Sequence, residues 1–145
     1  MPKTIYILNG PNLNLLGTRE PKIYGAATLD DIETACASKC KAAGYDMFFH
    51  QSNIEGEIVD QIQEAGREGV ALLINAAAYT HTSVAIYDAL KTLDIPIIEV
   101  HISQPASRES FRQQSFIAPV ATGSISGFGT NSYLLAINAA IESLQ

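Results

Sequence analysis

The chain has 145 residues, with apolar side chains at 47% of positions and charged ones at 17%, a composition typical of a folded globule rather than a disordered chain. Its length predicts a single domain over residues 1–145. The net charge of −6 argues against nucleic acid or a polybasic membrane face as a partner, since both need clustered Lys and Arg. With no signal-peptide pattern and no apolar run near the ~20 residues that cross a bilayer, we expect a soluble, cytoplasmic protein.

Short apolar strands alternate with amphipathic helices along the chain. The predicted strands are residues 4–9, 46–51, 70–75, 95–101 and 119–126. The predicted helices are 28–44, which opens on a capping box at Thr28 and stops at Gly44, then 55–68, 83–94 and 130–144. This alternation predicts an α/β fold, namely a flavodoxin-like, doubly wound five-stranded parallel sheet with helices on both faces. Ligands of such folds bind beyond the carboxyl ends of the strands.

Three familiar occupants of this architecture lack their required residues. The loop at 9–14 (NGPNLN) has no hydroxyl to cradle a flavin phosphate. A receiver domain needs carboxylates where Asn9 and Asn75 stand. The segment 123–127 (GSISG) places Ile125 where a serine hydrolase needs its nucleophile.

Cysteine and histidine spacing gives no metal or disulfide pattern. Cys36 and Cys40 are four apart on one predicted helix, so we interpret them as buried thiols in a reducing compartment. His50, His81 and His101 are separated by 31 and 20 residues, which matches no set of metal ligands. We therefore expect no metal site.

The arginines gather at the predicted ligand-binding edge. Only four are present, and Arg19, Arg108 and Arg112 fall in loops there, whereas Arg67 lies within a predicted helix. Guanidinium groups pair bidentately with carboxylate or phosphate, so these positions suggest a small anionic ligand. Solvated loop side chains remain the alternative.

Glu99 interrupts an otherwise apolar strand, and a carboxylate there is costly unless it is paired. His101 lies two residues on and so points to the same side. A Glu that orients a His is a common arrangement for general acid–base chemistry, although a purely structural pair is equally compatible with the spacing. His81, which lies just before a predicted helix, has polar neighbours that ordinary N-capping would also explain.

Tyr24 and Arg19 share a loop bounded by Gly17 and Gly25, the kind of hinged segment that closes over a ligand. The unperturbed pKa of tyrosine is about 10, and lowering it to near 7 needs ~4 kcal/mol of stabilisation, which guanidinium groups could supply. Spacing alone favours Tyr24 as a packing residue and His101 as the base.

Several motifs together resemble the type II 3-dehydroquinate dehydratases, and the similarity spans almost the whole chain. The matching residues are 9–17 (NGPNLNLLG), 19–21 (REP), 24–25 (YG), 51–53 (QSN), 55–56 (EG), Asn75, 79–83 (YTHTS), 98–103 (IEVHIS), Phe111, Arg112, Ser115, 121–123 (ATG) and Gly127. One departure is Ala76-Ala77, where many members carry Pro-Gly; it adds no polar group.

The resemblance implies reversible loss of water from 3-dehydroquinate to give 3-dehydroshikimate, a step of the shikimate pathway. Tyr24 would be the tyrosinate that removes a proton beside the ketone, and His101 the acid that protonates the departing hydroxyl of the enolate. Arg19 would hold the phenolate, with Arg108 as a second cation nearby.

Further roles carry over from the same resemblance. Asn12 would stabilise the enolate through a water, and Glu99 would orient His101. The groups implied to bind substrate are the side chains of Asn75, His81 and Arg112, the backbone at Ile102 and Ser103 for the carboxylate, and Asp88, which would reach a neighbouring subunit's site.

Proton removal next to a ketone needs no redox cofactor, so we expect none. Family members assemble as dodecamers built from trimers, so we expect a homo-oligomer. Of the five lysines only Lys22 could be argued for an imine route, and its simpler interpretation is a solvated side chain. Two alternatives remain at this point: the same reaction in quinate breakdown, and a non-catalytic binder of cyclic hydroxy acids.

Overall fold

The computed structural model describes residues 3–18, 22 and 26–145. Five strands form one parallel sheet in the order β2-β1-β3-β4-β5. Their bounds are β1 Lys3–Asn9, β2 Tyr45–Gln51, β3 Gly69–Asn75, β4 Ile97–His101 and β5 Gly123–Ser126. This is the predicted flavodoxin-like, doubly wound arrangement, and the sheet prediction is confirmed.

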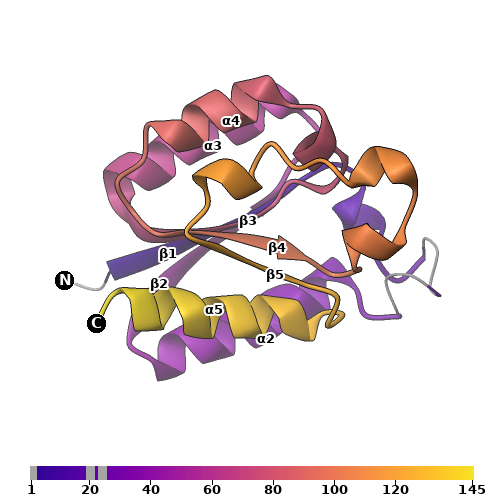
Figure 1. Ribbon diagram of the computed structural model, residues 1–145. Helices are drawn as coiled ribbons and strands as arrows, with labels where there is room; N and C mark the ends of the chain where they lie inside the picture. Colours follow the sequence, from indigo (N-terminus) through magenta and orange to yellow (C-terminus); the bar gives the residue numbers. More distant parts are fainter. Residues whose placement is uncertain (1–2, 19–21, 23–25) are drawn as a thin grey trace.

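The described residues form four α-helices, two on each face of the sheet (Figure 1). Their bounds are α2 Leu29–Ala42, α3 Glu55–Glu68, α4 Val84–Lys91 and α5 Asn131–Ser143. Helices α2 and α5 cover one face, and α3 and α4 cover the other. The predicted capping box is present, because Thr28 accepts from the Asp31 N–H while Asp31 accepts from the Thr28 N–H.

Each face of the sheet has its own apolar core, because alternate residues of a strand point to opposite sides. Ile5 and Ile7 pack under α2 and α5, whereas Tyr6 and Leu8 pack under α3 and α4. Strand β3 is buried along most of its length, as expected of a central strand of a parallel sheet. The cores hold the strands in register and so fix the positions of the side chains at their carboxyl ends.

The predicted fifth strand is too long. Residues 118–120 form a 3₁₀ helix, η5 (Ala118–Val120), and β5 begins only at Gly123. Pro119 has no N–H to give to a strand partner, which favours a tight turn here. Two smaller differences are that β4 begins at Ile97, after Pro96, and that α4 ends at Lys91 rather than at residue 94.

Cys36 and Cys40 are free, fully buried thiols on α2, as predicted. Burial, with smaller contributions from Cys40 and Glu33, raises the pKa of Cys36 to about 12, and burial also raises the pKa of Cys40. Thiols that stay protonated at neutral pH are poor nucleophiles and poor metal ligands.

In the part of the chain that the structure describes, no helix could cross a membrane.

Candidate active site

A cleft opens at the carboxyl edge of the sheet, where the loops after β1, β3 and β4 meet. The predicted site residues that line it are Asn12, Asn75, His81, His101, Ile102, Ser103, Arg108 and Arg112. The structure therefore brings together eight of the predicted residues in one cleft, at the place where doubly wound folds bind their ligands.

Close backbone packing holds together the loops beside this cleft. A Cβ on Gly10 would lie 2.3 Å from the carbonyl oxygen of Ala76, so only glycine allows the loops after β1 and β3 to approach this closely. Asn12 and Ala77, which both line the cleft, have left-handed backbones with φ of 69° and 52°. The Asn12 N–H donates to Asn53 Oδ1 at 3.0 Å, which helps to hold this unfavourable conformation.

Glu99 and His101 form the predicted pair at the end of β4. His101 Nε2 lies 2.7 Å from Glu99 Oε2, and the residues share a side because they are two apart on a strand. Glu99 is only 3% exposed. An ionised carboxylate can only accept hydrogen bonds, so Nε2 carries the hydrogen and Nδ1 is left for proton exchange.

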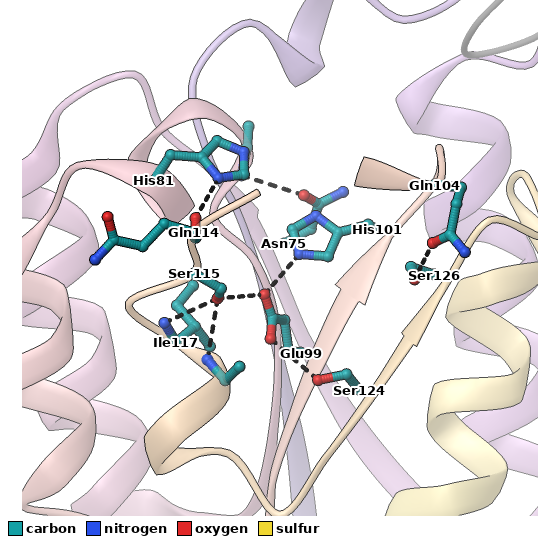
Figure 2. Close-up of polar contacts among 12 residues, drawn as sticks. Asn75, His81, Glu99, His101, Gln104, Gln114, Ser115, Ile117, Ser124 and Ser126 are labelled. Carbon is teal, nitrogen blue, oxygen red and sulfur yellow. Dashed lines mark hydrogen bonds and ion pairs between the residues drawn. The ribbon is translucent and has the colours of Figure 1, made fainter. Parts of the chain in front are cut away.

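Two hydroxyl groups complete the surroundings of Glu99 (Figure 2). Ser115 Oγ donates to Oε2 at 2.8 Å and Ser124 Oγ donates to Oε1 at 3.0 Å. Burial raises the pKa of the Glu99 carboxyl, but the hydrogen bond and charge of His101 and both serine hydroxyls outweigh it, so the pKa lies below its ordinary value. Glu99 is thus held as an anion inside the protein.

His81 lies at the end of the 3₁₀ helix η2 (Ala77–His81), and its Nδ1 lies 2.7 Å from the carbonyl oxygen of Gln114. A carbonyl only accepts, so Nδ1 carries the hydrogen and the neutral ring offers Nε2 as an acceptor. N-capping explains part of the polarity around His81, as predicted. Ser83 is the N-cap of α4, and its side chain accepts a hydrogen bond from the Ile86 N–H. His81 itself lines the cleft.

Asn75 is held by a buried network that the sequence did not predict. Its Nδ2 donates to the hydroxyl of Tyr133 at 3.0 Å, and that hydroxyl donates to Asn9 Oδ1 at 2.6 Å. Asn75 Oδ1 also accepts from the Ala77 N–H at 3.2 Å. Tyr133 comes from α5 and is fully buried; the signal that could have found it is a phenol hydroxyl within an apolar helix face, which needs a buried partner.

The two described arginines of the cleft share an acidic neighbour. Arg112 Nε donates to Glu109 Oε1 at 3.0 Å, and Arg108 Nε lies 3.6 Å from the same oxygen. Arg108 also donates to Ser103 Oγ at 3.2 Å. Glu109 was not predicted; its own backbone hydrogen bond and then Arg112 lower its pKa. The carboxylate orders both guanidinium groups at the cleft.

Other predicted residues fall outside the described lining of this cleft. Tyr24 and Arg19 lie outside the described residues. Asp88 is exposed on α4 and does not line this cleft. His50, expected to lie apart from the other histidines, pairs with Glu57 on α3. Among the described residues no cluster of three His, Cys, Asp or Glu could hold a metal ion.

Glu99 is buried and bonded to His101, which lines a cleft together with two arginines. On a flavodoxin-like scaffold, this arrangement is of the kind that suits acid–base chemistry on a small anionic ligand. Known proteins narrow this class. Residues 3–141 match the model of the family described as dehydroquinase class II. The chain therefore belongs to the class II dehydroquinase family, and it is a hydro-lyase.

Individual relatives agree with this assignment. The chain is 56% identical to a 3-dehydroquinate dehydratase of Phenylobacterium zucineum over 140 residues, which are 97% of each protein. Among solved structures it is similar to a type II dehydroquinase from Butyrivibrio crossotus, with a TM-score of 0.94, 42% identity and coverage of 97% of this chain and 98% of the other. A second, from Propionibacterium acnes, gives a TM-score of 0.92 at 42% identity, with 96% of each chain covered.

Proposed function

We propose that this chain catalyses the reversible dehydration of 3-dehydroquinate to 3-dehydroshikimate in the shikimate pathway, through an enolate intermediate. The observation that carries the proposal is the bond between the buried Glu99 and His101, since His101 lines a cleft together with Arg108 and Arg112. Family membership supports the overall reaction. The geometry of the cleft supports the role of His101 and its partner Glu99, and the roles of Tyr24, Arg19 and Asp88 rest on the resemblance to the family.

His101 supplies the acid. With Nε2 bonded to Glu99, the protonated ring presents its second N–H at Nδ1. This proton goes to the departing hydroxyl as the carbon–oxygen bond breaks and the enolate electrons form the new double bond. Glu99 stabilises the positive ring before this step and fixes its orientation, which general acid catalysis requires.

Tyr24 supplies the base, as a phenolate that removes the proton beside the ketone. Arg19 pairs with this phenolate, and Arg108 adds a second positive charge nearby. Positive charge favours the ionised form of a phenol, and no redox cofactor or metal is required for proton removal next to a carbonyl. Asn12 holds the water that stabilises the enolate oxygen.

The remaining cleft residues bind the substrate. Arg112 and the acceptor Nε2 of His81 meet its hydroxyl groups. Asn75 joins them through the second N–H of its Nδ2, since one is already given to Tyr133. The backbone at Ile102 and Ser103 takes the carboxylate. Asp88 lies outside this cleft and instead completes the site of a neighbouring subunit. The assembly is a dodecamer built from trimers, and the enzyme acts in the cytoplasm.

Near-ultraviolet absorbance tests this proposal, because the product is a conjugated enone and the substrate is not. Purified protein added to 3-dehydroquinate should give a rising absorbance, and the Tyr24→Phe variant should give none while it still binds the substrate. A flat trace from wild-type protein that still binds the substrate would refute the proposed catalytic function. It would instead favour a non-catalytic binder of cyclic hydroxy acids.

A further inference from the structure

Glu99 has three hydrogen-bond donors from three separate segments of the chain. His101 and Ser115 both donate to Oε2, at 2.7 and 2.8 Å, and Ser124 donates to Oε1 at 3.0 Å. Both carboxylate oxygens are therefore anchored (Figure 2). A carboxylate held at one oxygen can still turn about its terminal torsion, which is broad and roughly two-fold, whereas one held at both cannot.

The hydroxyl of Ser115 has only one direction open for its hydrogen. Its oxygen accepts from the N–H groups of Ile117 and Ala118, at 3.1 and 3.0 Å. A hydroxyl oxygen has two lone pairs and one hydrogen, so both lone pairs are used and the hydrogen is directed at Glu99. Ser115 thus serves as a fixed donor to Glu99 rather than as an exchangeable partner.

Strand register places Ser124 beside Glu99. Strand β5 pairs with β4 so that Glu99 is opposite Ser124, and His101 is opposite Ser126. Ser124 lies on the exposed edge strand, yet its hydroxyl reaches the buried carboxylate. Ser126 instead donates to Gln104 Oε1 at 2.9 Å, so the two serines share a strand and differ in their acceptor.

The segment around Ser115 also holds the second histidine of the cleft. Gln114 accepts the hydrogen of His81 Nδ1, and the Phe116 N–H donates to the carbonyl of Thr80 at 2.8 Å. Three consecutive residues therefore contact the His81 loop and Glu99 together. A change at Ser115 acts on both histidines, whereas a change at Ser124 acts on Glu99 alone.

We propose that Ser115 and Ser124 are positioning residues that keep Glu99 ionised and in one orientation. They thereby hold the His101 ring with its Nε2–H on Glu99, so that Nδ1 is the nitrogen that gains and gives the catalytic proton. The catalytic part of this proposal rests on the proposed dehydratase function, whereas the hydrogen-bonding part does not. Among the described residues, the other charged or titratable groups that line the cavity beside Glu99 and His101 are His81 and Arg112, and the variants below leave both in place.

The test uses Ser124→Ala and Ser115→Ala, with Ser126→Ala as the matched control and threonine at 115 and 124 as rescue. Carbon-13 NMR follows the titration of the Glu99 carboxyl, and long-range nitrogen-15 NMR follows which ring nitrogen of His101 carries hydrogen. Each alanine variant removes a donor from the charged carboxylate, so the Glu99 titration should move to higher pH and the share of the Nε2–H form should fall.

Turnover should fall in both alanine variants, and more in Ser115→Ala than in Ser124→Ala. A hydrogen bond to a charged group predicts a loss of kcat of about tenfold for Ser115→Ala, and of about threefold for the exposed Ser124, which water can partly replace. KM should stay within about twofold of wild type in Ser124→Ala, which acts on Glu99 alone, and should rise further in Ser115→Ala, which also acts on the His81 loop. In both variants the acidic limb of the kcat profile should move to higher pH. Threonine should restore all three readouts, and Ser126→Ala should match wild type.

Unchanged NMR titrations in both alanine variants would overturn the proposal, as would an equal loss of kcat in Ser126→Ala. If wild-type protein shows no turnover of 3-dehydroquinate, the dehydratase function fails. The NMR readouts then still decide whether the serines hold Glu99 and His101 as described.

Discussion

Among the residues that the structure describes, two histidine–glutamate pairs use equivalent atoms in different surroundings. His101 Nε2 and Glu99 Oε2 are 2.7 Å apart, with side chains only 11% and 4% exposed. His50 Nε2 and Glu57 Oε1 are 3.0 Å apart, with side chains 42% and 43% exposed. Both residues of the first pair lie on the interior strand β4, and His101 lines the cleft. The second pair joins the edge strand β2 to the first turn of α3.

The surroundings of a pair, rather than its two residue types, decide whether it can form a site. Water screens the His50–Glu57 pair, and exposed pairs contribute about 0–1 kcal/mol. Glu99 is removed from water and receives two further hydroxyl donors, so losing a partner there leaves a buried charge or dipole unsatisfied. A buried, fully bonded pair has one orientation, which proton transfer to a bound substrate requires.

The largest expected difference between the pairs is in turnover of 3-dehydroquinate. His101→Ala should lower kcat by about 10²–10⁴-fold, the usual contribution of a general acid. His50→Ala, which removes the same side chain from the exposed pair, should leave kcat within about twofold of wild type. Steady-state absorbance assays of both variants measure this, and similar losses in the two would contradict the distinction.

Removing the carboxylates should separate the pairs in stability. Glu99→Gln places an amide N–H₂ among three donors, so we expect the free energy of unfolding to fall by about 1–3 kcal/mol. Glu57→Gln should change it by no more than about 0.5 kcal/mol. Urea denaturation of both variants measures this difference. A fall in the free energy of unfolding as large in Glu57→Gln as in Glu99→Gln would contradict the distinction between the pairs.

The smallest expected effect is in the pH dependence of stability. The folded pKa of Glu99 lies below the ordinary value of 4.5 because of its donors. The contribution of ionised Glu99 to the free energy of unfolding is therefore fully present above about pH 4.5. It is lost as the pH falls through the lower folded pKa. In unfolding measured from pH 7 downwards, the gap in free energy between wild type and Glu99→Gln should not narrow until the pH falls below 4.5. A gap that narrows near pH 6 would contradict the lowered pKa.

Local sequence patterns predicted the parts of the fold and site that depend on near neighbours in the chain. Alternation along β4 placed Glu99 and His101 on one side, and the order of apolar segments gave the sheet. The capping residues at Thr28 and Asp31 marked the start of α2. These features follow from periodicity and from turn chemistry, which a single segment carries by itself.

The contacts that complete the site join segments far apart in the sequence, and no local pattern reports them. Tyr133 meets Asn9 across 124 positions, and Ser124 meets Glu99 through the register of β5. Ser115 entered only as one residue of a family motif, and Gln114 gave no signal because its backbone carbonyl is the acceptor. The 3₁₀ helix before β5 was missed because its apolar residues also suit a strand.

The division of labour between Tyr24 as base and His101 as acid is the central claim, and hydrogen exchange with solvent tests it most directly. In D₂O, wild-type protein should exchange the substrate proton beside the ketone and also release water. His101→Ala should retain the exchange but lose nearly all dehydration, because the enolate still forms, and Tyr24→Phe should lose both. Exchange that survives in Tyr24→Phe and disappears in His101→Ala would reverse the assignment and contradict the account.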